Sequence, residues 1–108
     1  MLKVKEVAEI VGVSVRTLHH YDRIGLLSVA KDHRSGYRIY SDEDLDRLEQ
    51  ILFFRELGFE LKKVKEMLDN PQYDRASALE MQHVLLLKKK NRLDKIIDSL
   101  EQTMKANE

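Results

Sequence analysis

The most constraining feature of this 108-residue chain is an apolar repeat in its C-terminal part. Leucines recur every seven residues, at Leu79, Leu86, Leu93 and Leu100. Ile97 lies four residues after Leu93, and Met104 lies four residues after Leu100. His83 and Lys90 occupy the equivalent earlier places, so the pattern is complete only near the C-terminus. This spacing is typical of the a and d positions of a coiled coil.

The repeat predicts a long helix. Asp74 can cap this helix, which can continue to about Ala106. About thirty residues at ~1.5 Å per residue make a rod of roughly 45 Å. An ordinary core helix is the alternative, but the four shorter helices expected before it cannot cover that length. We therefore expect residues 74–106 to form a dimerisation helix that pairs with a second copy about a two-fold axis.

The N-terminal residues have the pattern of a helix-turn-helix. A first short helix is predicted by apolar residues at helical spacing, which are Val4, Val7, Ala8 and Val11. Gly12 breaks that helix, and Ser14 then stands where an N-cap belongs. A second helix is expected from about Val15 to Asp22. Two short helices joined at a glycine are typical of this motif.

A β-hairpin is expected directly after the second helix. The extended runs Leu27–Val29 and Tyr37–Tyr40 flank a polar stretch that contains Gly36. Alternation places Tyr37 and Ile39 on one face, with Tyr37 as the packing residue, and Arg38 and Tyr40 on the other. A hairpin in this position is called a wing.

Two more helices complete a first domain of residues 1–70. Ser41 and Asp44 form a capping box for a helix that reaches about Leu57, and Gly58 suits its end. A further helix runs from about Leu61 to Asp69 and is stopped by Pro71. The sequence therefore predicts a mainly α, winged helix-turn-helix fold followed by the long helix.

Composition excludes several classes of protein. There is no cysteine, so disulfides and thiolate metal sites are excluded, and no apolar run is long enough to cross a membrane. His19 and His20 are about 100° apart on a helix and cannot easily share a metal. No nucleophile, base and orienting group stand together in a known motif. We expect a cytoplasmic, nucleoid-associated protein that is not an enzyme, with no metal, no cofactor and no small-molecule site in this chain.

The charge distribution favours DNA as a partner. The whole chain has 19 basic and 19 acidic residues, but residues 1–40 hold seven Lys/Arg against four Asp/Glu. The second predicted helix carries a cationic stripe of Arg16, His19 or His20, and Arg23, flanked by Thr17 and Tyr21. Arginine can contact guanine edges or phosphate, and hydroxyls can donate to phosphate. The alternative is an ordinary solvated face.

Two further groups of cations are candidates for phosphate contacts. Arg38 lies on the returning arm of the wing. Lys62 and Lys63 lie in the first turn of a helix, where cations oppose the helix dipole by roughly 0.3–1 kcal/mol each at low salt. A phosphate bound there would remove the conflict, although exposed lysines also tolerate a screened dipole.

Several strings of this sequence resemble the MerR family of bacterial transcription regulators. They are Val4–Ala8, Gly12–Leu27, Gly36–Tyr40, Asp44-Leu45 and Leu57–Phe59 with Leu61. The quartet His19-His20-Tyr21-Asp22 is similar to the multidrug-responsive branch of Mta-like and TipA-like activators. The resemblance covers residues 1 to about 70, and the last helix by architecture.

The resemblance implies a homodimer joined by an antiparallel coiled coil. It implies that the second helix enters the major groove of a near-palindromic operator, while the wing and the start of the fourth helix hold phosphates. It also implies that RNA polymerase is a partner, and that promoters with an over-long spacer are activated by bending and untwisting the DNA. The expected DNA-binding residues are Ser14, Arg16, Thr17, His19, His20, Tyr21, Arg23, Tyr37, Arg38, Tyr40, Lys62 and Lys63.

The sequence departs from the family pattern in places. Val29 stands where many members have proline, and Glu60 stands where Ser or Thr commonly caps the fourth helix. The chain ends after the long helix, so we expect a DNA-binding fragment or a short regulator without an effector domain. Three alternatives stay open: a repressor on the same fold, a coiled-coil module that binds another protein, and a DNA-bending factor that does not contact polymerase.

Overall fold

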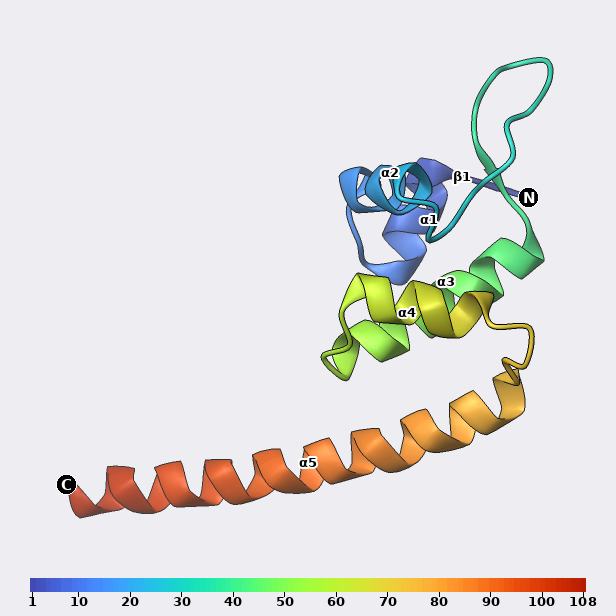
Figure 1. Cartoon of the computed structure of the whole chain (residues 1–108). Helices are drawn as coiled ribbons and strands as arrows, with labels where there is room; N and C mark the ends of the chain where they lie inside the picture. The colour runs from blue at the N-terminus through green and yellow to red at the C-terminus, as the bar shows by residue number, and fades with distance from the viewer. The chain divides into compact units, whose positions relative to one another are not determined.

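The computed structural model describes all 108 residues, which form two compact units, residues 1–70 and 71–108 (Figure 1). The elements in chain order are β1 (Leu2–Lys3), α1 (Val4–Val11), α2 (Val15–Arg23), β2 (Ile39–Tyr40), α3 (Asp42–Glu56), α4 (Leu61–Asp69) and α5 (Arg75–Ala106). The mainly helical class with a small antiparallel sheet is confirmed. No helix combines the length and the apolar content that crossing a bilayer requires.

The helix-turn-helix forms at the predicted residues. Gly12 ends α1 in the left-handed conformation with φ of 75°, which other residues rarely adopt. Ser14 begins α2, and its Oγ accepts a hydrogen bond from the backbone N–H of Thr17 at 3.0 Å. Val7 of α1 and Leu18 of α2 are fully buried. The turn and the cap therefore place the two helices against each other through their apolar sides.

The wing is present, but its first arm lies later in the chain than predicted. The residues of its two arms are joined by the bridge between Lys31 and Arg38 and by a bond from the Ile39 N–H to the Ala30 carbonyl. Leu27 is instead buried at the end of the α2 turn, so the expected strand Leu27–Val29 does not form. The reason is that the N–H groups of Leu26 and Leu27 both donate to the Tyr21 carbonyl and continue the helix end.

The strand β2 pairs with the N-terminal strand β1. The pairing is antiparallel, with Leu2 opposite Tyr40 and Lys3 opposite Ile39. This pairing joins the start of the chain to the base of the wing. No repeat or turn signal predicts this pairing, because the two strands are only two residues long and far apart in the chain.

Helices α3 and α4 follow their predicted bounds closely. The Ser41–Asp44 capping box forms, with bonds of 3.1 and 3.0 Å between each side chain and the other's backbone N–H. At the other end Gly58 has φ of 88°, and the Phe59 N–H reaches back to the Phe54 carbonyl. The Phe54 and Phe59 rings also lie 5.2 Å apart, as in a Schellman end with its apolar contact.

One arginine joins three parts of the first unit. Arg47 of α3 donates to the Leu26 carbonyl at 2.7 Å and to Asp69 of α4 at 2.8 Å, and Lys65 donates to the same carboxylate at 2.9 Å. These bonds, from Lys65 first and Arg47 second, lower the pKa of Asp69 below its ordinary value. Beneath them lies an apolar core that includes Leu26, Leu48, Ile51, Phe54 and Val64.

Helix α5, taken by itself, is the long helix that the repeat predicts. It has 32 residues, and Asp74 caps it by accepting from the Ser77 N–H at 3.2 Å. Every residue from Leu87 onward is exposed. The exposed apolar side chains of this part are Leu87, Leu93, Ile96, Ile97, Leu100 and Met104. In the N-terminal half of α5, Leu79 is at the border of exposure and Leu86 is partly buried, whereas Met81 and Val84 are exposed.

Candidate nucleic-acid interface

The outer side of α2 carries the predicted cationic stripe. Arg16 and Arg23 are exposed, while Thr17, His19 and His20 are partly buried. The Arg23 guanidinium lies 3.4 Å from His20 Nδ1, within hydrogen-bond distance. Leu18 faces the core, which leaves the arginines and histidines to face outward. A helix with this exposed face can present donors to a DNA groove.

Ser14 has a local role at the start of α2. Besides its bond to the Thr17 N–H, its Oγ lies 2.9 Å from Thr17 Oγ1. Both hydroxyls are therefore already paired with each other. Their place at the first turn keeps them next to Arg16, but their clearest function is to fix where α2 begins.

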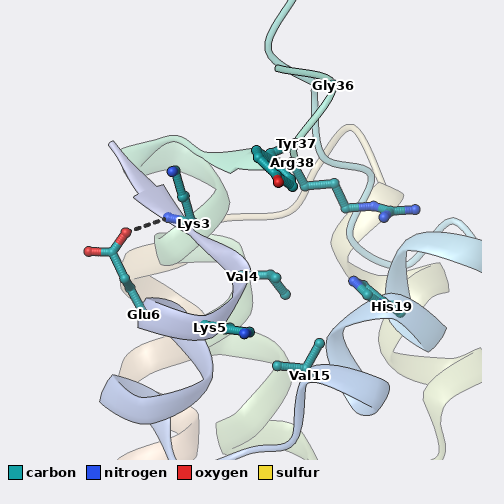
Figure 2. Close-up of a pocket in the computed structure, with 9 residues that line it drawn as sticks. All are labelled: Lys3, Val4, Lys5, Glu6, Val15, His19, Gly36, Tyr37 and Arg38. Atoms are coloured by element: carbon teal, nitrogen blue, oxygen red, sulfur yellow. Dashed lines mark hydrogen bonds between the residues drawn. The ribbon is translucent and has the colours of Figure 1, made fainter.

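The wing is joined to α2 by an ion pair that the sequence pattern did not reveal. Arg38 Nε donates to Asp22 Oδ2 at 2.5 Å, and both side chains are partly buried. Asp22 was recognised only as part of the family-like quartet, not as a functional residue. The pair fixes the direction in which the Arg38 side chain leaves the wing, and Figure 2 shows that side chain extending towards α2 above His19.

The three tyrosines expected at the interface differ in burial. Tyr40 is 1% exposed, and its buried hydroxyl has no hydrogen-bond partner. Burial, and secondarily the nearby Asp22 carboxylate, raise the pKa of Tyr40. Tyr21 is also a core residue. Both side chains are therefore mostly buried rather than part of the exposed face, and a DNA contact through either of them stays a prediction.

Tyr37 shows the opposite deviation. The alternation pattern predicted it as the packing residue of the wing, yet it is 62% exposed. The Lys3 amine lies 5.4 Å from the centre of its ring, in cation–π range. Tyr40, which lies opposite Leu2 in the β1–β2 pair, is the buried tyrosine of this arm instead. Tyr37 is thus available at the surface as a contact residue.

An open pocket lies between the wing and the helix-turn-helix. Its volume is about 520 Å³, and Figure 2 shows the side chains that line it. The charged and titratable lining residues are Lys3, Lys5, Glu6, His19 and Arg38. His19 and Arg38 were predicted as contact residues, whereas Lys3 and Lys5 were not. The excess of basic residues before position 40 was the only signal that could have pointed to these lysines.

Lys62 and Lys63 are exposed in the first turn of α4. Glu60 occupies the N-cap position without making a side-chain cap bond, and the first turn holds no acidic residue. Glu60, which stands where Ser or Thr commonly caps this helix, therefore does not replace that cap. A role of these lysines in phosphate binding stays a prediction.

The chain offers no cluster of metal ligands. No three His, Cys, Asp or Glu side chains lie together where they could hold a metal ion.

Comparison with known proteins identifies the class. Residues 2–71 match the profile of the MerR HTH family regulatory proteins, and residues 45–106 match the profile described as MerR, DNA binding. Together with the winged helix-turn-helix and its exposed cationic helix, these matches define the class as that of the MerR HTH regulatory proteins. The chain belongs to the MerR family.

The individual relatives are activators. The chain is 56% identical over 94% of its length to the transcriptional activator Mta of Bacillus subtilis, and 52% identical over 95% to the activator TipA of Streptomyces coelicolor. It spans 40% of the first relative and 41% of the second. The resemblance to the Mta-like and TipA-like branch is thus confirmed, for about two fifths of the length of those proteins.

Solved structures agree with this assignment. The N-terminal part of Bacillus subtilis Mta, a multidrug transporter activator, superposes with a TM-score of 0.66 at 55% identity and covers 96% of this chain and 98% of that one. The regulator SkgA of Caulobacter crescentus superposes at 0.82 with 44% identity, covering 94% of this chain and 73% of that one. HiNmlR, a MerR regulator that lacks the sensor domain, was solved bound to promoter DNA; it superposes at 0.72 with 29% identity, covering 94% and 86%.

Proposed function

We propose that this chain is the DNA-binding and dimerisation part of a transcription activator that binds a near-palindromic operator as a homodimer. The observation that carries the proposal is the exposed cationic side of α2, tied to the wing by the Asp22–Arg38 pair. The 56% identity to the activator Mta supports activation as the outcome of binding.

In this proposal α2 enters the major groove. Arg16 and Arg23 are exposed and long enough to contact base edges or phosphates, and the partly buried His19 and His20 flank them. The wing then lies along the adjacent backbone, with Tyr37 and Arg38 at its base. Lys62 and Lys63 contact a phosphate at the start of α4.

The second copy of the chain would cover the apolar side of α5. Leu93, Ile97, Leu100 and Met104 are between 47% and 60% exposed in the single chain. Such a continuous apolar stripe is costly in water, and an identical helix can cover it in a two-fold arrangement. We propose an antiparallel coiled coil of the 74–106 helices, which would hold two α2 helices at a fixed separation for two half-sites.

Activation would act through the shape of the DNA. A rigid dimer that grips two half-sites can bend and untwist the duplex between them, at a cost of roughly 1–6 kcal/mol for a smooth bend. We propose that this distortion brings the two elements of a promoter with an over-long spacer into register for RNA polymerase. The protein would then act in the cytoplasm, at the nucleoid.

The test begins with a selection of binding sites from randomised duplexes. We expect a selected sequence with two related halves, bound by the dimer with an affinity that falls steeply as salt rises. Transcription in vitro is then measured from promoters that carry this site in a normal or a lengthened spacer. Stimulation confined to the lengthened spacer supports the proposal.

Other outcomes of the same experiment decide against it. Reduced transcription would make the chain a repressor, and bending without any change in transcription would make it an architectural factor. If the chain binds no duplex even at low salt, the result would favour the alternative that it is a coiled-coil module that binds another protein.

A further inference from the structure

We infer that the pocket between the wing and the helix-turn-helix is a seat for one phosphodiester group of the DNA backbone in each half-site, held by Lys3 and Lys5. This inference rests on the proposed function, because the phosphodiester belongs to the duplex whose major groove receives α2. It adds two contact residues from the N-terminal segment, to which neither the sequence pattern nor the family resemblance gave a role.

The charge of the pocket favours an anion. Lys3, Lys5 and Arg38 line it, against Glu6 as its one acidic lining residue. The Glu6 carboxylate accepts from the Lys3 backbone N–H at 3.1 Å and so serves the start of α1. In Figure 2 it points away from His19 and Arg38. Arg38 is already paired with Asp22, so the remaining positive charge comes from Lys3 and Lys5, against the single negative charge of Glu6.

The position of the pocket favours a phosphodiester over a free anion. One wall is formed by Val15 and His19 of α2, and the opposite wall by Tyr37 and Arg38 of the wing. A duplex that receives α2 in its major groove carries a sugar-phosphate strand at the edge of that groove, between helix and wing. The apolar side chains of Val4 and Val15, which also line the pocket, suit a sugar face.

The Lys3 amine is already held on the wing side of the pocket. It lies 5.4 Å from the centre of the exposed Tyr37 ring. The contact restricts the long side chain before DNA arrives, which reduces the entropy lost on binding. Lys5 lies in the first turn of α1, two residues after Lys3, so both lysines line the pocket from one segment of the chain.

The test compares the wild-type chain with Lys3→Gln/Lys5→Gln on the selected operator duplex. Removing one phosphate contact per half-site should flatten the slope of log affinity against log salt by about two units for a dimer. Lys88→Gln/Lys105→Gln removes the same charge from exposed positions of α5 and is the matched control. Lys3→Arg/Lys5→Arg should keep most of the wild-type slope.

The seat itself is located with duplexes in which single phosphates are replaced by neutral methylphosphonates. At one position per half-site, the replacement should lower the affinity of the wild-type chain for the duplex. The affinity of the glutamine variant should not change at that position. Thermal melting followed by circular dichroism checks that all variants are folded. In a separate experiment, inorganic phosphate is added at constant ionic strength. If it lowers the duplex affinity of the wild-type chain but not that of the glutamine variant, this result also supports the phosphodiester site.

Two results would overturn the inference. In the first, the glutamine variant and the α5 control show the same slope and the same affinity. In the second, every methylphosphonate lowers the duplex affinity of the wild-type chain and of the glutamine variant equally. If instead the wild-type chain itself binds no duplex, the proposed function fails, and this failure is distinguishable because it appears before any variant is made.

Discussion

Shortening Leu100 to alanine tests the proposed dimer at one of the most exposed apolar residues of α5. Leu100 is 58% exposed in the single chain. A partner helix can therefore bury at most this part of its surface. Full burial of a leucine side chain is favourable by about 1.5–3 kcal/mol, so 58% of it corresponds to about 1–1.7 kcal/mol for each copy. A two-fold dimer contains the substitution twice, which gives about 2–3.5 kcal/mol.

This free energy converts to a measurable shift in association. Since about 1.4 kcal/mol changes an equilibrium constant tenfold, Leu100→Ala should raise the dimer dissociation constant by roughly 30- to 300-fold. Alanine keeps its Cβ, so we expect the lower part of this range. Sedimentation equilibrium over a range of protein concentrations measures the constant directly. Gln102→Ala, an exposed polar position about 200° around the helix, is the control.

The reasoning is refuted if Leu100→Ala associates as strongly as the control. It is also refuted if the wild-type chain is monomeric at micromolar concentration. In a supporting experiment, a chain that ends before residue 75 should be monomeric, because the apolar stripe is then absent.

Four further predictions concern the first unit. Arg16→Ala should cost about 1–3 kcal/mol on the selected operator and much less on random duplex, measured by fluorescence anisotropy; equal losses would make Arg16 a phosphate contact. Arg38→Ala should weaken all duplexes similarly and flatten the salt slope by about one unit per half-site, and an unchanged slope would exclude it as a phosphate contact. Ser14→Ala removes the α2 cap and should lower stability by about 1 kcal/mol in a denaturant titration; no change in the midpoint would contradict the cap. Because the pKa of Asp69 is lowered in the folded state, its stabilising effect is complete above its ordinary value of 3.8 and is lost as the pH falls through the lower, folded value. As the pH is lowered, the free energy of unfolding of Asp69→Asn should therefore fall less than that of the wild type. The same dependence on pH for both chains would show that the bonds from Lys65 and Arg47 to Asp69 contribute nothing to stability.

Much of this architecture could be predicted from the sequence because its signals are local. Ser14, Ser41 and Asp74 each cap a helix by bonding a backbone N–H three residues ahead. Gly12 and Gly58 end helices at positive φ, a conformation that depends on the residue itself. The apolar period of α5 likewise depends only on neighbours within one helix.

The candidate interface was predicted less completely, since it depends on residues that are distant in the chain. Alternation along Tyr37–Tyr40 correctly separates two faces, but it does not say which face meets the core. In the folded chain Tyr40, which lies opposite Leu2, is buried, and Tyr37 is exposed. A cationic stripe on a helix is visible from spacing alone, so Arg16 and Arg23 were found without the fold.

The helices, their ends and the apolar side of α5 could therefore be predicted, because each follows from propensities and hydrogen bonds over a few residues. Only the folded chain shows that Asp22 holds Arg38, and that Lys3 and Lys5 line a pocket together with residues of α2 and the wing. The physical reason is that an ion pair across sixteen residues, or a pocket lined by three separate segments, exists only after packing has brought those segments together.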